Sequence, residues 1–70
     1  MSLSVLLCFL LHLSIIVSPG SYYQSEIDSH YVQNQAEIDA LYNSPEQQVI
    51  VNTYSPQLEW IEIWDDDILD

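Results

Sequence analysis

An uncharged apolar run near the start of the chain most constrains what this protein can fold into. The run extends from Leu3 to Val17 and is interrupted only by Ser4, His12 and Ser14. A helix that is apolar on every side belongs in lipid or inside a large core, and a chain of 70 residues buries too little surface to hide one. As a helix the run would extend about 22 Å, which is shorter than the hydrocarbon layer of roughly 30 Å. It therefore predicts the hydrophobic region of a signal peptide.

The residues after the run fit a signal-peptidase site. Ser18 and Gly20 place small side chains at the third and first positions before Ser21, so cleavage is expected between Gly20 and Ser21. The two residues before the run carry no lysine or arginine, and the positive-inside rule then specifies orientation only weakly. Residues 1–20 are predicted to be a signal peptide or a membrane anchor that contacts a membrane at least transiently through residues 3–17. An apolar tail without a membrane role is a further alternative.

The charge balance excludes several classes of partner. The chain has eleven Asp and Glu residues, no Lys and no Arg, and a formal net charge of −11 at pH 7. Nucleic-acid binding needs cations that displace counterions from phosphates, and docking on anionic lipid needs the same cations. We therefore expect no nucleic acid as a partner. A basic protein partner is the one that the charge favours.

Catalytic, cofactor and metal sites are not expected, and neither is a small-molecule substrate. The single cysteine, Cys8, lies within the apolar run, and His30 is the one histidine outside it. The one glycine, Gly20, allows no glycine-rich phosphate loop. The carboxylates between Asp65 and Asp70 lack the glycine and the ligand spacing of a calcium loop.

Residues 21–70 are expected to hold little tertiary structure alone. A chain of about fifty residues without disulfides folds only marginally, and uncompensated negative charge opposes compaction. The predicted fold class is mostly α or largely disordered, with an N-terminal apolar helix and no independent globular core. The expected organisation is the leader 1–20, an amphipathic helix within 21–43 and an acidic Trp-containing tail, 44–70.

A weak repeat of eleven residues predicts the amphipathic helix. Eleven residues make three helical turns, so equivalent positions fall on one face. The two matching columns are Ile27, Ile38, Val49 and Trp60, and Tyr31, Tyr42, Thr53 and Trp64. A helix is predicted over about residues 26–42, ended by the proline at position 45. Residues 48–53 and 58–63 combine helix-start signals with β-forming residues; we favour two strands in a short hairpin or an irregular segment over helices.

The tail from Leu58 to Asp70 carries both tryptophans among carboxylates. Exposed aromatic residues surrounded by charge are typical of binding hot spots. Continuation of the helical stripe explains the same tryptophans equally well. The predicted partner-binding residues are Tyr31, Tyr42, Trp60, Ile63 and Trp64.

Two short peptide motifs are similar to parts of this tail. The segment 59–63, EWIEI, resembles the aromatic-x-x-aliphatic motif by which autophagy receptors add a β-strand to small ubiquitin-like adaptor proteins. That resemblance implies that Trp60 and Ile63 fill two pockets of the adaptor. The segment 58–60 is similar to the tryptophan-acidic motif read by kinesin light chain, although Ile61 stands where that class has an acidic residue. Both motifs require a cytosolic tail, which a cleaved signal does not give.

Taken together, these features predict a small secreted acidic peptide that acts by protein binding and is not an enzyme. One alternative is a single-pass membrane-anchored micropeptide with a cytosolic acidic Trp docking tail. The other is a translated open reading frame without a selected function.

Overall fold

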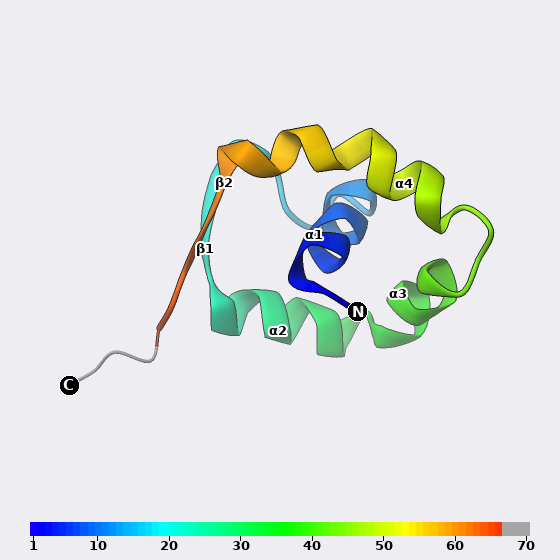
Figure 1. Cartoon of the computed structure of the whole chain (residues 1–70). Helices are drawn as coiled ribbons and strands as arrows, with labels where there is room; N and C mark the ends of the chain where they lie inside the picture. Colours follow the sequence, from blue (N-terminus) through cyan, green and yellow to red (C-terminus); the bar gives the residue numbers. More distant parts are fainter. Residues whose placement is uncertain (67–70) are drawn as a thin grey trace.

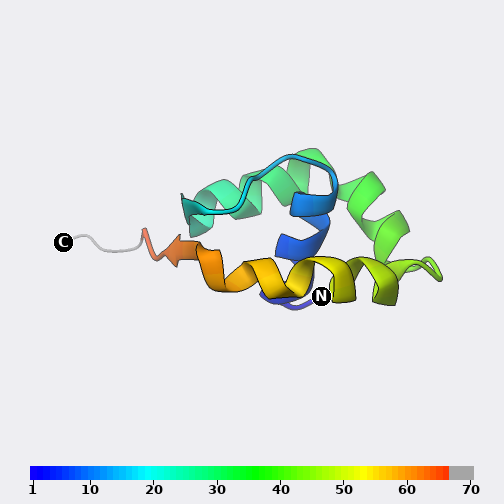
Figure 2. The ribbon, with the colours of Figure 1, turned by 90° about the horizontal axis from the view of Figure 1, so that it is seen from above.

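The computed structural model describes residues 1–66, and these residues fold around one central helix. The elements in chain order are α1 (Leu3–His12), β1 (Gly20–Tyr23), α2 (Gln24–Gln33), α3 (Gln35–Tyr42), α4 (Gln47–Tyr54), the 3-10 helix η1 (Ser55–Trp60) and β2 (Ile61–Trp64). Figure 1 shows α1 in the middle of the other elements, and the view from above places it between α2–α3 and α4–η1 (Figure 2). The expectation of a largely disordered chain is therefore wrong. Residues 67–70, which include Asp67 and Asp70 of the predicted acidic tail, lie outside the described residues.

The apolar run does form a helix, but the helix is short because both of its ends are capped. At the start, the Val5 N–H donates to the side-chain oxygen of Ser2 (3.2 Å), as an N-cap requires. At the end, Ser14 has a φ of 61°. The N–H groups of Ser14 and of the next residue donate to the carbonyls of Leu11 (3.0 Å) and Leu10 (2.9 Å), which is the Schellman arrangement. The resulting helix of 10 residues extends only about 15 Å.

α1 supplies most of the hydrophobic core. Its buried residues are consecutive, Leu7–Leu11, so every side of the helix is covered. The surrounding helices contribute one buried isoleucine each: Ile27, Ile38 and Ile50. The expectation that the chain has no independent core is wrong because about three turns of helix present a surface small enough for short elements to enclose. Among residues 1–66, no helix has both the length and the apolar character needed to cross a membrane.

The helix predicted over residues 26–42 is two helices instead of one. Asn34 separates α2 from α3 with φ −122° and ψ 24°, and its side-chain amide donates to the carbonyl of His30 (2.9 Å). An asparagine that bonds the backbone in this way competes with the helical hydrogen bonds. The break lets the chain curve around α1 (Figure 1). As a result, Ile27 and Ile38 are both fully buried.

The strand predicted over residues 48–53 is also wrong, because these residues belong to α4. Ile50 is buried while its neighbour Val49 is 64% exposed. The hydroxyl of Thr53 donates to the Val49 carbonyl one turn earlier (2.7 Å). One-sided packing against α1 thus outweighs the β preference of this Val- and Ile-rich segment.

The two strands pair in parallel, so the predicted hairpin is wrong. Gly20 lies opposite Ile61 and Tyr23 lies opposite Trp64. β2 is shorter than the strand predicted over residues 58–63, because the residues before Ile61 belong to η1. A parallel pair needs a long crossover between its strands, and α2, α3, α4 and η1 provide it by running around α1. The sheet thereby closes the ring around the central helix.

Candidate protein-binding site

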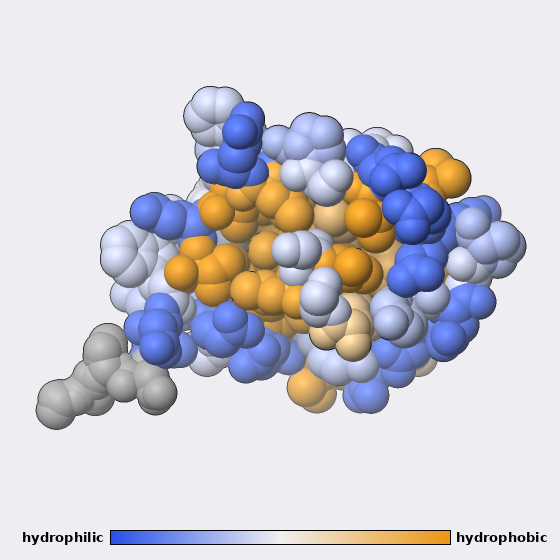
Figure 3. Space-filling view, viewed as in Figure 1, coloured by the Kyte–Doolittle hydropathy of each residue, from blue (hydrophilic) through white to orange (hydrophobic). Residues whose placement is uncertain are grey.

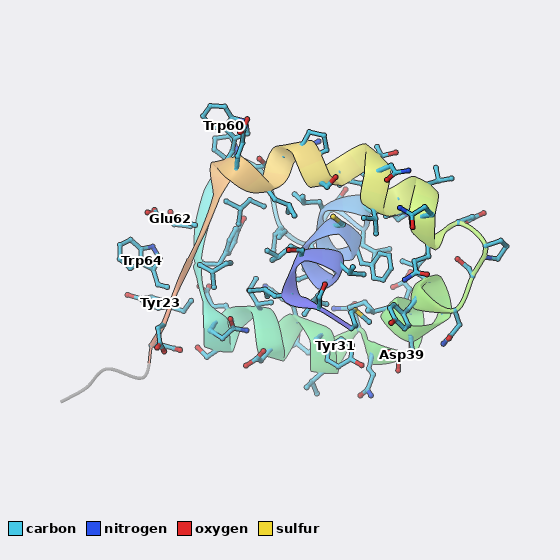
Figure 4. All side chains as sticks on the ribbon, in the orientation of Figure 1. Tyr23, Tyr31, Asp39, Trp60, Glu62 and Trp64 are labelled. Carbon is cyan, nitrogen blue, oxygen red and sulfur yellow. The ribbon has the colours of Figure 1, made fainter. Side chains whose placement is uncertain are left out.

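An outward-facing surface at the sheet combines aromatic and acidic side chains from both ends of the chain. We call it the aromatic-acidic face, and its members are Tyr23, Trp60, Glu62 and Trp64. It arises because side chains alternate along a strand. Ile61 and Ile63 pack against the core, which leaves the residues between and beside them pointing outward. Figure 4 shows Tyr23, Glu62 and Trp64 projecting from the strands away from α1, and Trp60 projecting outward where η1 meets β2.

The aromatic members of this face are unusually exposed for their size. Trp60 is 61% exposed, Trp64 is 52% and Tyr23 is 53%. Tyr23 and Trp64 are direct partners in the strand register, so their backbones lie about 4.8 Å apart. The Ser21 hydroxyl donates to the Glu62 carboxylate (3.3 Å), which lies opposite it. These rings stay exposed although the fold has a hydrophobic core, and exposed rings of this size offer contact area for a partner.

An open hollow of about 470 Å³ lies beside Trp60. Its lining residues come from the start of both strands and from the residues just before them: Pro19, Gly20, Ser21, Glu59, Trp60, Ile61 and Glu62. A tryptophan ring attracts a cation over its face, and the carboxylates of Glu59 and Glu62 add opposite charge. The chain has no lysine or arginine of its own to occupy this place. The hollow therefore suits an ammonium or guanidinium group from another molecule.

The residues predicted to bind a partner do not all lie together. Trp60 and Trp64 are on the aromatic-acidic face, but Ile63 faces the core. Tyr31 is on α2, far along the ring (Figure 4), and Tyr42 is the last residue of α3, 39% exposed. In the autophagy-type motif Trp60 and Ile63 enter two pockets of the partner. Here Ile63 packs inward while Trp60 is exposed.

Tyr31 takes part in a hydrogen bond between α2 and α3. Its hydroxyl donates to the carboxylate of Asp39 (2.9 Å). This bond, together with burial and the negative charge of Asp39, raises the pKa of Tyr31 above its ordinary value. The contact holds the two helices on either side of the break at Asn34, so Tyr31 has a role within the fold.

Tyr23 and Glu62 are the members that sequence reasoning missed. Tyr23 follows the expected cleavage site, where the sequence predicts no strand. The signal for Glu62 was present, since Trp60, Glu62 and Trp64 alternate with Ile61 and Ile63. The strand that pairs with this segment was not foreseen from its four residues, GSYY.

The two residues of the expected cleavage site lie in β1. Gly20 is half-buried at the start of the strand, and Ser21 follows it with its side chain exposed. A Cβ on Gly20 would lie 2.8 Å from the Val17 carbonyl oxygen and 2.9 Å from the Tyr22 ring. The Tyr22 hydroxyl also accepts from the Val17 N–H (2.9 Å). Gly20 therefore allows a close approach that any larger residue would disturb.

The remaining side chains that could carry chemistry are the thiol of Cys8 and the side chains that could bind a metal ion. Cys8 is fully buried in α1, and burial raises the pKa of its thiol, so it is shielded and poorly nucleophilic. Within residues 1–66, no three His, Cys, Asp or Glu residues are placed to hold a metal ion. Comparison with protein families, curated proteins and solved structures finds no match to this chain.

Proposed function

We propose that this protein acts by binding a basic protein partner through the aromatic-acidic face. The observation that carries the proposal is the exposure of three large aromatic side chains near Glu62. Tyr23 and Trp64 lie on the outer side of the two-stranded sheet, and Trp60 ends η1 next to it. Tryptophan and tyrosine are common at binding hot spots because they bury a large area and lose little side-chain freedom. The pairing of β1 with β2 positions Tyr23 and Trp64 before a partner binds, which lowers the entropic cost of ordering these side chains.

The charge of the whole chain supports a partner rich in lysine or arginine. The net charge of −11 would raise the rate of encounter with a basic surface at low salt. In the complex, a lysine or arginine side chain would lie over Trp60 in the hollow, beside Glu59 and Glu62. Contacts of this kind depend on salt, because exposed charges are screened over about 10 Å at 0.1 M ionic strength.

The binding form in this proposal is the intact chain. Six of the nine buried apolar residues among residues 1–66 precede Ser21, so cleavage after Gly20 would remove most of the core. Secretion with loss of residues 1–20 is a second proposal, supported by the length of the apolar run and the small residues that follow it. Mass spectrometry of the protein from cells separates the two forms, since the first keeps Met1 or Ser2 and the second begins at Ser21.

Binding to short synthetic peptides tests the proposal. We expect a Lys/Ser peptide to bind the intact protein, and a Glu/Ser peptide of equal length to show no binding. Trp60→Ala should weaken binding of the Lys/Ser peptide about tenfold or more. Calorimetry at low salt measures both effects.

Two charge-matched variants provide the control. Glu62→Gln and Glu46→Gln each remove one negative charge, but Glu46 precedes α4 and lies outside the face. Glu62→Gln should weaken binding of the Lys/Ser peptide severalfold more than Glu46→Gln. Equal effects of these variants, together with no effect of Trp60→Ala, would show that only the net charge attracts the peptide and would refute the site.

A further inference from the structure

The ring of elements leaves the N-terminal end of α1 uncovered. Figure 3 shows an apolar surface at the centre of this side of the molecule, bordered by hydrophilic residues. At the start of the chain, Met1 is 46% exposed and Leu3 is 40% exposed. Single exposed apolar residues are ordinary, but a continuous apolar surface with a polar border marks an interaction site.

Two hollows lie beside the first turns of α1. The larger, about 420 Å³, is lined by Leu3, Gln24, Ile63, Trp64 and Asp65. The smaller, about 160 Å³, is lined by Met1, Leu6 and Tyr31. These linings contain three of the residues that the sequence predicted to bind a partner: Tyr31, Ile63 and Trp64.

Trp64 connects this apolar end to the aromatic-acidic face. It lines the larger hollow, and it also stands beside Tyr23 on the outer side of the sheet. A partner segment that passes over Trp64 would therefore contact both surfaces. One surface offers apolar contact and the other offers aromatic rings with carboxylates.

We infer that the partner of the proposed function is an amphipathic basic segment. Its large apolar side chains enter the hollows beside Leu3 and Leu6, and its lysine or arginine side chains lie against the aromatic-acidic face. This inference rests on the proposed function and specifies the chemistry of its partner. A second copy of the chain is disfavoured as the occupant because it would bring another charge of −11. Anionic lipid is disfavoured for the same reason.

A pair of peptides with equal charge tests the inference separately from the proposed function. The probes are an amphipathic Lys/Leu peptide and a Lys/Ser peptide of the same length. We expect the Lys/Leu peptide to bind about tenfold more tightly, because its apolar side chains are removed from water. Leu3→Gln should abolish this advantage, so that the variant binds the two peptides with similar affinity. Val32→Gln is the matched control, since Val32 is 68% exposed on α2 and should change neither affinity.

The possible outcomes separate the two ideas. Equal binding of the two peptides by the unmodified protein would overturn the amphipathic partner and leave the proposed function standing. Failure of both peptides to bind would refute the proposed function. Analytical ultracentrifugation and flotation with phosphatidylcholine vesicles examine the other occupants of the apolar end. A dimer, or vesicle binding, that Leu3→Gln abolishes would assign this surface to a second copy or to lipid and would overturn the inference.

Discussion

Replacing Phe9 tests whether the leader is the core of this protein. Phe9 is fully buried within α1, and truncating a buried phenylalanine to alanine costs about 3–5 kcal/mol. A 70-residue domain is stabilised by roughly 3.5–10 kcal/mol in total. Phe9→Ala should therefore remove a large part of the free energy of unfolding. With a urea m-value of about 1 kcal/mol/M for a small domain, the midpoint should fall by about 3 M or the protein should be unfolded in water.

Val17 is the matched control for this experiment. It belongs to the same apolar run, but it is 64% exposed, so Val17→Ala should change the free energy of unfolding by no more than about 0.5 kcal/mol. Phe9→Leu keeps most of the buried volume and should cost about 1.5 kcal/mol or less. Far-UV circular dichroism during urea titration measures all three variants. Equal midpoints for Phe9→Ala and Val17→Ala would refute the central position of α1, because a leader outside the core would not distinguish them.

Four further results are expected from the same structure. Ser14→Gly should stabilise the protein by about 1 kcal/mol, because glycine adopts a positive φ without the penalty that serine has; a lower thermal midpoint would contradict the Schellman end of α1. Gly20→Ala should destabilise the fold through the close approach to Val17, although alanine suits a signal-peptidase site; an unchanged midpoint would speak against this packing. Cys8 should react with an alkylating reagent far more slowly in native protein than in urea, and equal rates would place it outside the core. The pKa of Tyr31 is raised in the folded state, so its hydrogen bond should stabilise the fold fully below pH 10 and lose that effect as pH rises through the folded pKa. Tyr31→Phe should remove this part of the decrease in the free energy of unfolding at alkaline pH. Identical pH profiles for the two proteins would refute the assignment.

The local patterns of the sequence identify which segments are apolar. They do not show that the apolar run and the apolar stripe pack against each other. The eleven-residue repeat predicts that Ile27 and Ile38 share one apolar stripe, and the surface that buries both residues is the chain's own leader. The apolar run was expected to be helical, and it is helical from Leu3 to His12. The error was to treat the run as fifteen continuous helical residues. Ser14 ends the helix in a left-handed conformation, which serine adopts much less readily than glycine, so no sequence signal marked it.

The candidate site could be predicted only in part for a similar reason. The exposed position of Trp60 and Trp64 follows from a chain that has few places to bury large rings. Their grouping with Tyr23 depends on a parallel pairing between segments that are about forty residues apart in the sequence. Pairing between distant segments is set by the path of the helices between them, and four residues such as GSYY carry too little pattern to reveal it.

Composition alone carries the prediction of a basic partner, because a net charge of −11 without lysine or arginine opposes contact with polyanions wherever the residues lie. The sequence likewise predicts that the apolar run must be buried away from water. Only the tertiary structure decided what buries it, and it also decided that the β-forming residues 48–53 become a helix. The physical reason is that the hydrophobic effect has no direction. Apolar surface must leave water, but whether lipid or three distant isoleucines receive it depends on how the remaining chain can close around a helix of ten residues.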